Sequence, residues 1–271
     1  MSKVLVIVVT YNGMPWLDRC LSSVCVSTKN AQNVDVDLFV VDNDSTDGSA
    51  DFVQAHFPQT KLVRSAENLG FSKANNLGMR YALDKGYDYV YLLNQDAWLE
   101  EGALEILVAA AVKDPKYAVL SPLQMTDGFK ELDRLFEKDK TPPAAHWLMP
   151  VAALKTVGFF EEELFPLYGQ DDDWCNRARY KGLGIGIVAE ARAVHDRAQR
   201  TESKEKVIRR NYYTGSLVRL CNPNRPLWER FCFVCLFTVV KAVKYGSFRP
   251  FRYFRQICRQ LPAVRRHRAE S

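Results

Sequence analysis

The first 121 residues alternate continuous apolar runs with segments whose apolar residues recur at helical spacing. The first run, Val4–Val9, contains only valine, isoleucine and leucine, which is typical of a strand buried on both faces of a parallel sheet. The same patterns predict strands at 37–42, 61–64, 89–93 and 117–121, and helices from 15 onward and at 46–57, 72–85 and 100–112. Because strands and helices alternate, we predict a doubly wound α/β fold with a mostly parallel central sheet.

The alternation becomes irregular after residue 122. Residues 123–141 are polar and highly charged, and we interpret them as a long loop beside a functional site. Beyond this loop, the pattern predicts strands at 145–149, 184–188 and 192–195 and helices at 151–157 and about 172–181. We therefore expect one domain over 1–200, in two halves at 1–122 and 123–200, followed by a helical extension over 201–271.

Composition sets outer limits on the fold. A chain of 271 residues with 47% hydrophobic content can bury a full core. The seven cysteines are irregularly spaced, and Cys232 and Cys235 lie in an apolar run without a second Cys or His pair, which favours reduced thiols over a zinc site. The chain starts directly with a strand pattern and shows no signal-peptide pattern, so we expect a cytoplasmic domain.

Charge divides the chain unevenly. Residues 1–196 carry 19 Lys and Arg against 28 Asp and Glu, a net charge of −9, whereas residues 197–271 carry 18 against 4, a net charge of +14. Aromatic and basic residues interleave over 225–268, which predicts a segment lying on an anionic membrane surface. A core-packing helix followed by a basic tail is the alternative. We expect no nucleic-acid binding, because no known reading module accompanies the charge.

Polar clusters follow three of the predicted strands, at the edge where open α/β sheets bind ligands. Asp96 comes just after the strand at 89–93, and its carboxylate with the amides of Asn94 and Gln95 suits a divalent cation that bridges two phosphates. Each cluster alone can also be a turn with a helix cap. Their meeting on one edge favours a ligand site, whose other candidate members are Thr10, Tyr11, Asn12, Asp42, Asn43, Asp44, Asn68, Gly70, Phe71, Asn75 and Asn76.

The glycine-rich phosphate loops of dinucleotide-binding enzymes and of P-loop proteins are absent from the sequence. A diphosphate bound at this edge would therefore be neutralised by a metal near Asp96, which leaves the glycosyl end of a nucleotide ligand free to react. His195 ends a predicted strand on the same edge, and we predict it as a second metal ligand, with a purely structural histidine as the alternative.

Three consecutive aspartates, Asp171, Asp172 and Asp173, start a predicted helix. The helix N-terminus favours their ionised forms, and their mutual repulsion raises at least one pKa, as a general base acting on a hydroxyl group requires. A solvated acidic helix cap, with Arg177 paired to Asp173, is the alternative. One of these three carboxylates could act as the base, and we expect four residues on the acceptor side of the site: Trp147, Asp172, Asp173 and Arg177.

These motifs together resemble the inverting family-2 glycosyltransferases with the GT-A fold, especially the rhamnosyltransferase-like branch. The resemblance covers residues 4–196 in the family's order. The matching segments are Val8-Val-Thr-Tyr-Asn12, Val40-Val-Asp-Asn-Asp-Ser-Thr-Asp-Gly-Ser49, Glu67-Asn-Leu-Gly-Phe71, Asn75-Asn-Leu-Gly78, Leu92-Leu-Asn-Gln-Asp-Ala97, Gly158-Phe-Phe-Glu161, Tyr168-Gly-Gln-Asp-Asp-Asp-Trp-Cys-Asn-Arg177 and Val194-His-Asp196.

The resemblance implies roles for individual residues. Residues 1–122 would form the donor half and 123–200 the acceptor half, with Asp96 as the metal-binding aspartate, His195 as a further ligand and Asp171 as the base. The residues implied to contact the nucleoside are Thr10, Asn12, Asp42 and Asn43, and those lining the donor pocket are Asn68, Asn75 and Asn76. Two positions depart from the family pattern, because Asn94 and Gln170 stand where relatives often carry acidic residues.

The expected protein is an inverting glycosyltransferase that uses Mg²⁺ or Mn²⁺ on the inner face of the cell membrane. It would move a sugar from dTDP-rhamnose or a UDP-hexose to a hydroxyl of a cell-surface glycan or lipid-linked acceptor. One alternative is a sugar nucleotidyltransferase, although the segment Thr10–Pro15 lacks its usual Gly-rich, basic loop. The other is a non-catalytic, nucleotide-sugar-binding membrane adaptor, which Asn94 and Gln170 encourage.

Overall fold

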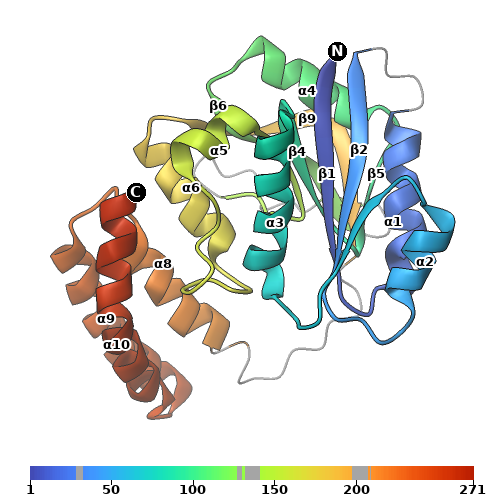
Figure 1. The fold of residues 1–271 in the computed structure, drawn as a ribbon. Coiled ribbons are helices and arrows are strands. Elements are labelled where there is room, and N and C mark those ends of the chain that lie inside the picture. Colours follow the sequence, from blue (N-terminus) through green and yellow to red (C-terminus); the bar gives the residue numbers. More distant parts are fainter. Residues whose placement is uncertain (29–32, 127–129, 132–140, 197–206, 208) are drawn as a thin grey trace.

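The computed structural model describes the chain except residues 29–32, 127–129, 132–140, 197–206 and 208. Its centre is one sheet in which the strands follow the order β3-β2-β1-β4-β8-β6-β9-β5, with β7 paired to β6 (Figure 1). The strands are β1 Ser2–Thr10, β2 Val34–Asp42, β3 Lys61–Arg64, β4 Tyr89–Asn94, β5 Ala97–Leu99, β6 Tyr117–Thr126, β7 Lys130–Glu131, β8 His146–Pro150 and β9 Gly184–His195.

The sheet is mixed. β1 pairs in parallel with β2 and β4, and β2 pairs in parallel with β3, so the N-terminal part has the predicted parallel arrangement. β8 runs antiparallel to both β4 and β6, and β5 runs antiparallel to β9, whereas β6 and β9 are parallel. All four parallel strands of the first part therefore end at the same edge of the sheet.

Helices cover both faces of this sheet because the side chains of each strand alternate between them. Val4, Val6 and Val8 of β1 pack on one side with α1, α2 and α4, whereas Leu5 and Ile7 pack on the other side with α3, α5 and α6. These helices are α1 Met14–Ser27, α2 Ser49–His56, α3 Gly70–Lys85, α4 Ala103–Lys113, α5 Val151–Val157 and α6 Gln170–Tyr180. Two separate apolar cores thus hold the sheet between two helical layers.

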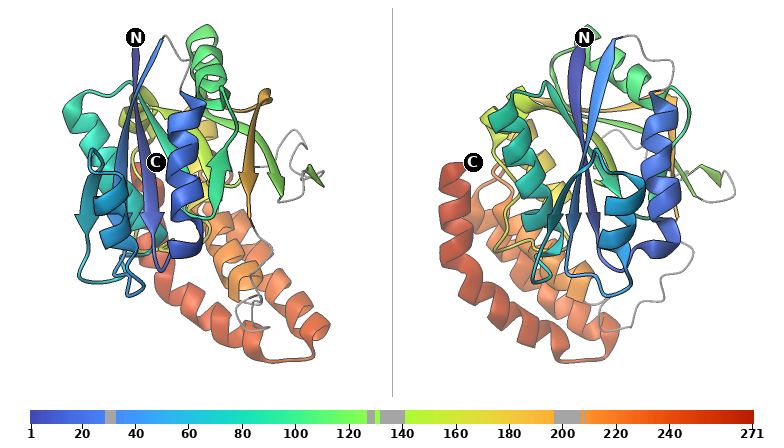
Figure 2. Two further views of the ribbon diagram at one scale, coloured as in Figure 1. Left: turned by 90° about the vertical axis from the view of Figure 1, so that its right-hand side faces the viewer. Right: turned by 45° about the vertical axis from the view of Figure 1, so that its right-hand side comes forward.

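The C-terminal extension is helical, as predicted, and has a core of its own. Its described residues contain the π-helix η1 (Arg209–Thr214) and the α-helices α8 (Gly215–Cys221), α9 (Leu227–Tyr245) and α10 (Arg249–Glu270). Tyr212, Val234, Ile257 and Val264 form this core together with Phe165 from the first domain. Both views in Figure 2 show the extension beyond the carboxyl ends of β1 and β2, which is the edge predicted to bind ligands.

The helices and strands predicted before residue 122 appear in the expected order, with shifted ends. Three details were wrong. β6 continues through Thr126 into the predicted loop, and β7 also lies there; the rest of that loop is outside the described residues. Two strands predicted at 184–195 are one strand, β9, with an irregularity where Pro122 pairs with Val188 but Leu123 pairs with Arg192. β5 was not predicted, because three residues are too few to show a period.

Candidate active site

A cleft of about 520 Å³ lies at the carboxyl edge of the parallel strands. Residues at the ends of β1, β2 and β4 form one wall. The other wall is formed by residues just before β8, at the start of α6 and in η1. Its lining residues are Val9, Tyr11, Asn43, Asn68, Gly70, Phe71, Asn94, Gln95, Asp96, Pro143, Ala144, Ala145, Leu167, Tyr168, Gln170, Asp171, His195 and Arg210. Most of the strand-end residues predicted to bind a donor therefore face one cavity.

Gln95 joins the ends of β1 and β4. Its Oε1 accepts hydrogen bonds from the Thr10 hydroxyl at 2.9 Å and from the Tyr11 N–H at 2.8 Å. Gly13 has to be glycine beside this junction, because a Cβ there would lie 2.3 Å from Thr10 Oγ1 and 2.6 Å from Gln95 Oε1. Thr10 is thus buried behind the cleft and positions the two residues that line it, Tyr11 and Gln95.

Asn43 and Asn68 hold the adjoining wall together. The Asn43 side chain donates to Asn68 Oδ1 at 3.0 Å, and its own Oδ1 accepts from the Leu69 N–H at 2.7 Å. Position 70 favours glycine, because the residue adopts a left-handed φ of 75° and a Cβ there would lie 2.8 Å from the Pro166 carbonyl oxygen. This network fixes the side chains of Asn43 and Asn68 and the backbone of Gly70 on the cleft surface.

Asp96 and His195 face each other across the end of β4. Both are almost fully buried, with 3% and 5% of their surface exposed, yet both line the cleft. His195 Nε2 lies 3.4 Å from Asp96 Oδ1. Two ligands of one small divalent cation, each about 2.1 Å from it, have a similar separation. The pair therefore fits a metal site, and the imidazole nitrogen suits Mn²⁺ better than it suits Mg²⁺.

A second buried histidine supports this pair from behind. His146 hydrogen-bonds with the Tyr91 hydroxyl at 3.0 Å and with the Val194 carbonyl at 3.1 Å. Burial, and then the nearby His195 ring, lower the pKa of His146 to about 3, so it is neutral at physiological pH. A neutral ring adds no positive charge that would compete with a cation at Asp96.

Asp171 is the second residue of α6 and lines the cleft from the opposite wall. Burial, followed by the negative charge of Asp172, raises the pKa of Asp171 to about 6. One Asp171 oxygen accepts the Asp172 N–H at 3.0 Å, which orients the carboxyl group. A carboxylate with a pKa near the working pH is effective in general base catalysis. Repulsion from Asp172 thus raises the pKa of Asp171, as predicted for this aspartate run, although burial is the larger cause.

Several predicted site residues lie in the core instead. Trp147 is fully buried, donates its indole N–H to the Pro142 carbonyl and packs against Trp174. The prediction that Trp147 contacts an acceptor is therefore wrong. Asn75 and Asn76 are buried within α3 and bond to the backbone oxygens of Phe71 and Phe160, so they do not line the donor pocket.

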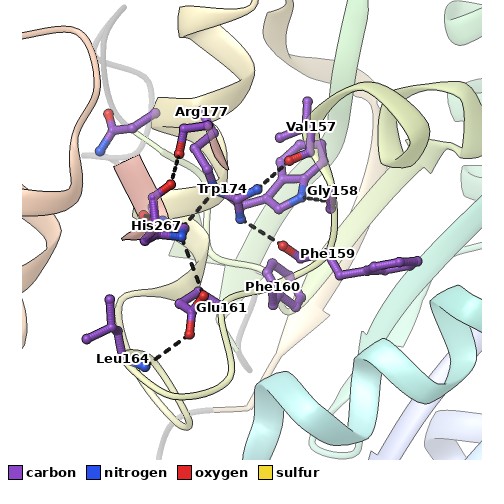
Figure 3. Close-up of polar contacts among 12 residues, drawn as sticks. Val157, Gly158, Phe159, Phe160, Glu161, Leu164, Trp174, Arg177 and His267 are labelled. Atoms are coloured by element: carbon purple, nitrogen blue, oxygen red, sulfur yellow. Dashed lines mark hydrogen bonds and ion pairs between the residues drawn. The ribbon is translucent and has the colours of Figure 1, made fainter. Parts of the chain in front are cut away.

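Asp173 and Arg177 form a buried ion pair, which is the alternative that their spacing of four residues also predicts. Arg177 Nε donates to Asp173 at 3.0 Å, and its guanidinium also donates to the carbonyl oxygens of Val157 and Phe159 (Figure 3). Neither side chain can reach an acceptor, so their predicted acceptor contacts are wrong. Asn12, Asp42, Asp44 and Asp172 lie around the cleft but do not line it.

The ion pair extends to the last turn of α10. His267 Nε2 lies 2.9 Å from Asp173 and Nδ1 lies 3.4 Å from Glu161 (Figure 3). Burial alone would lower the pKa of His267, but the hydrogen bonds to Asp173 and then Glu161 raise it to about 9. The hydrogen bond from His267 lowers the pKa of Glu161 to about 2. Two carboxylates and two cations therefore balance in this buried network.

One buried group in the described part of the chain has the residue types of a metal site, namely Asp173, Cys221 and His267. Burial raises the pKa of the Cys221 thiol well above its ordinary value, so this sulfur is protonated. Since Asp173 is already paired with Arg177 and His267, an added cation would have to break a balanced network. The Asp96 and His195 pair in the cleft fits a catalytic cation better.

Arg210 was missed as a cleft residue. It belongs to η1 in the extension, lines the cleft, and lies over the Tyr168 ring at 5.7 Å. In the sequence it is one of eighteen basic residues after position 196, and no pattern distinguishes it from the rest. Tyr168 and Gln170 also line the cleft. The sequence indicates Gln170 only as a departure from the family pattern and gives no site role to Tyr168.

The family model described as "Glycosyl transferase family 2" matches residues 5–159. The N-acetylglucosaminyl-diphospho-decaprenol L-rhamnosyltransferase of Mycobacterium tuberculosis (strain H37Rv) is 33% identical over 127 residues, 44% of this chain and 40% of that relative. The dTDP-rhamnosyl transferase RfbF of Shigella flexneri is 27% identical over 218 residues, 72% of this chain and 69% of RfbF. The match thus spans about two fifths of the mycobacterial relative and more of RfbF.

Among solved structures, S. aureus TarS superposes with a TM-score of 0.62 at 18% identity, covering 84% of this chain and 41% of TarS. TarS 1–349 in complex with UDP-GlcNAc gives a TM-score of 0.60 at 16% identity, covering 87% of this chain and 71% of that one. The shared fold confirms the GT-A architecture expected from the sequence.

Proposed function

Because the chain belongs to glycosyl transferase family 2, we propose that its cleft binds a nucleotide-sugar and transfers the sugar to an acceptor hydroxyl. One observation carries it. Asp171 faces the same cleft as the pair of Asp96 and His195, and burial raises the pKa of Asp171 to about 6. A base and a diphosphate-binding group in one cavity are the two parts that glycosyl transfer needs.

The donor would occupy the wall formed by Tyr11, Asn43 and Asn68, with its diphosphate toward Asp96. Two relatives are rhamnosyltransferases, one of which has dTDP in its name, and TarS has been solved with UDP and with UDP-GlcNAc. These names support dTDP-rhamnose or a UDP-hexose as the donor class.

Asp96 and His195 would hold the divalent cation, Mn²⁺ or Mg²⁺. When bound, such an ion acts as a Lewis acid that offsets the negative charge of the departing diphosphate. The protein's contribution is to place one carboxylate oxygen and one imidazole nitrogen 3.4 Å apart on the cleft wall. The side-chain amide of Asn94, on the same wall, adds a neutral oxygen without adding charge, whereas Gln95 Oε1 is already bonded to Thr10 and Tyr11.

Asp171 would take the proton of the acceptor hydroxyl. The hydroxyl oxygen then forms a bond to the anomeric carbon while the bond from that carbon to the diphosphate oxygen breaks. A single displacement without an enzyme nucleophile inverts the configuration of the anomeric carbon. Gln170, next to the base, leaves Asp171 with one negative neighbour fewer than a glutamate there would.

The acceptor would be a cell-surface glycan or a lipid-linked sugar on the inner face of the cell membrane. The name of the mycobacterial relative, a transferase acting on a decaprenol-linked sugar, supports a lipid-linked acceptor. In the described part of the chain, no helix has the length and apolarity needed to cross a bilayer.

A panel of nucleotide-sugars tests the proposal. The full chain is mixed with dTDP-rhamnose and the common UDP- and GDP-sugars, with and without Mn²⁺, while thermal stabilisation and release of free nucleotide are followed. One donor that raises the melting temperature and is slowly hydrolysed supports the transferase. Pyrophosphate release from a nucleoside triphosphate would instead support a nucleotidyltransferase, and donor binding without any turnover would support the adaptor.

A further inference from the structure

The outer face of α9 carries a continuous apolar stripe. Residues spaced three or four apart share one face of a helix, and here they are Cys232, Leu236, Val239, Val240 and Val243. All five are exposed, Leu236 to 66% and Val243 to 78%. The opposite face of α9, with Val234 and Thr238, is buried against the extension's own core, so the stripe is not needed for folding.

The apolar surface continues to the turn that joins α9 and α10. Phe248 at this turn is 86% exposed, and its ring packs only on its neighbour Phe251 among the described aromatic contacts, with centroids 6.3 Å apart. Trp228, at the other end of α9, is 71% exposed. Large aromatic residues on a soluble surface mark a binding site when they join an apolar patch.

Basic residues are exposed on α10, the helix that packs beside α9. On α10, Arg252, Arg255 and Arg259 share the face that points away from the core, and all three are exposed. Residues 227–270 carry 10 Lys and Arg against 2 Asp and Glu, a net charge of +8. An apolar face flanked by cations is the pattern of helices that lie in the headgroup region of anionic membranes.

The hairpin of α9 and α10 is held firmly to the catalytic domain. His267 near the end of α10 pairs with Asp173 of α6 and with Glu161. Within the extension, Arg268 donates to the carbonyl oxygens of Leu220 and Arg225 and so ties α10 to the end of α8 and the turn after it. The extension also sends Arg210 into the cleft. A surface that binds α9 would therefore hold the cleft in one orientation.

We propose that the α9 stripe and the Phe248 turn insert into the headgroup region of an anionic bilayer, with the α10 arginines contacting its phosphates. This inference deepens the proposed function, because it identifies the surface that would keep the cleft beside a lipid-linked acceptor. A second copy of the chain fits less well, since a symmetric contact would bring two surfaces of net charge +8 together.

Vesicle sedimentation tests this proposal. The full chain is mixed with phosphatidylglycerol–phosphatidylcholine vesicles and with pure phosphatidylcholine vesicles, without donor or acceptor. We expect binding to the anionic vesicles that weakens with salt. The double variant Leu236→Glu/Val243→Glu should lower the partition coefficient at least about tenfold, because it puts two charges at the inserted face.

Two further variants separate the contributions. Arg252→Glu/Arg255→Glu should also weaken binding about tenfold or more and flatten its salt dependence. Val112→Glu, on α4 and 63% exposed, introduces the same charge far from the hairpin and should bind like the unmodified chain. All of these positions are exposed, so melting temperatures should stay unchanged and report any loss of folding.

Three outcomes would overturn the proposal: no binding to anionic vesicles at low salt, equal binding by the stripe variant, or a dimer in light scattering that the stripe variant dissociates. Donor hydrolysis is measured in parallel without vesicles. Normal hydrolysis by a stripe variant that has lost vesicle binding supports the membrane surface. If the unmodified chain binds anionic vesicles but hydrolyses no donor, the proposed function is contradicted and the membrane surface is not.

Discussion

Three consecutive aspartates at the start of α6 have three different surroundings. Asp171 lines the cleft with a pKa raised to about 6, Asp172 is exposed, and Asp173 is buried in an ion pair with Arg177. The sequence shows only that like charges are adjacent. Which carboxylate faces the cavity depends on the helical rotation of about 100° per residue and on segments distant in the chain.

Asp171→Asn should stabilise the fold at neutral pH. The folded pKa of Asp171, about 6, lies above its ordinary value of 3.8. The protonated form is therefore favoured in the fold, and this contribution is present below about pH 4 and lost as pH rises through 6. We expect the variant to gain up to about 3 kcal/mol over the unmodified protein at pH 8, and almost nothing at pH 4. Urea unfolding at both pH values measures the difference; a destabilised variant at pH 8 would contradict the burial argument.

Asp96→Asn should remove the metal dependence of donor binding. The substitution keeps the shape of the side chain but removes the charge beside His195, so affinity for Mn²⁺ should fall at least about tenfold. Calorimetric titration of donor with and without Mn²⁺ checks this. Asp44→Asn is the control, because Asp44 is exposed, does not line the cleft, and has a φ of 69° that asparagine tolerates. An unchanged Mn²⁺ effect in Asp96→Asn would remove Asp96 from the proposed site.

At the scale of elements, the first half of the fold was predictable because its strands are buried on both faces and appear as unbroken apolar runs. The short strand β5 and the irregular strand β9 were not, since their pairing partners lie about 100 residues apart. Asn75 and Asn76 show the same limit for the site. Polar residues inside α3 suggested a ligand pocket, whereas Asn76 bonds to Phe160, which is 84 residues away in the sequence.

The contact between α6 and α10 depends on His267. Replacing it with alanine would leave Asp173 and Glu161 buried without its positive charge, which typically costs about 3–5 kcal/mol. The folded pKa of His267, about 9, exceeds its ordinary value of 6.5, so this stabilisation is complete below about pH 6.5 and is lost as pH rises through 9.

Urea unfolding of His267→Ala between pH 6 and 10 measures that stabilisation. The variant should be destabilised most at pH 6, and its stability should change less with pH than that of the unmodified protein. Arg266→Ala is the control, because its ion pair with Glu163 is solvent-exposed and worth less than about 1 kcal/mol. If the two variants lose equal free energy of unfolding, the buried network does not stabilise the packing of α10 against α6.

At the scale of the whole molecule, the C-terminal extension contributes to the cleft itself. The division at residue 200 stays a prediction, and the core of the extension includes Leu164 and Phe165 from before that boundary. Arg210, however, lines the cleft from the extension side, so the cavity is built from both parts. The sequence predicts a basic, amphipathic tail after the domain. The packing of η1 against the cleft identifies Arg210, among the described residues, as an arginine of that tail that lines the cavity.

The central claim, that Asp171 is the base of a nucleotide-sugar transferase, is tested most directly by a pH–rate profile of sugar transfer. The unmodified enzyme should lose kcat/KM about tenfold per unit below pH 6, because the base must be ionised. Asp172→Asn should move this limb to lower pH, since the charge of Asp172 is the second cause of the raised pKa. Asp171→Asn should abolish transfer while still binding donor. A profile that neither substitution changes would contradict the account.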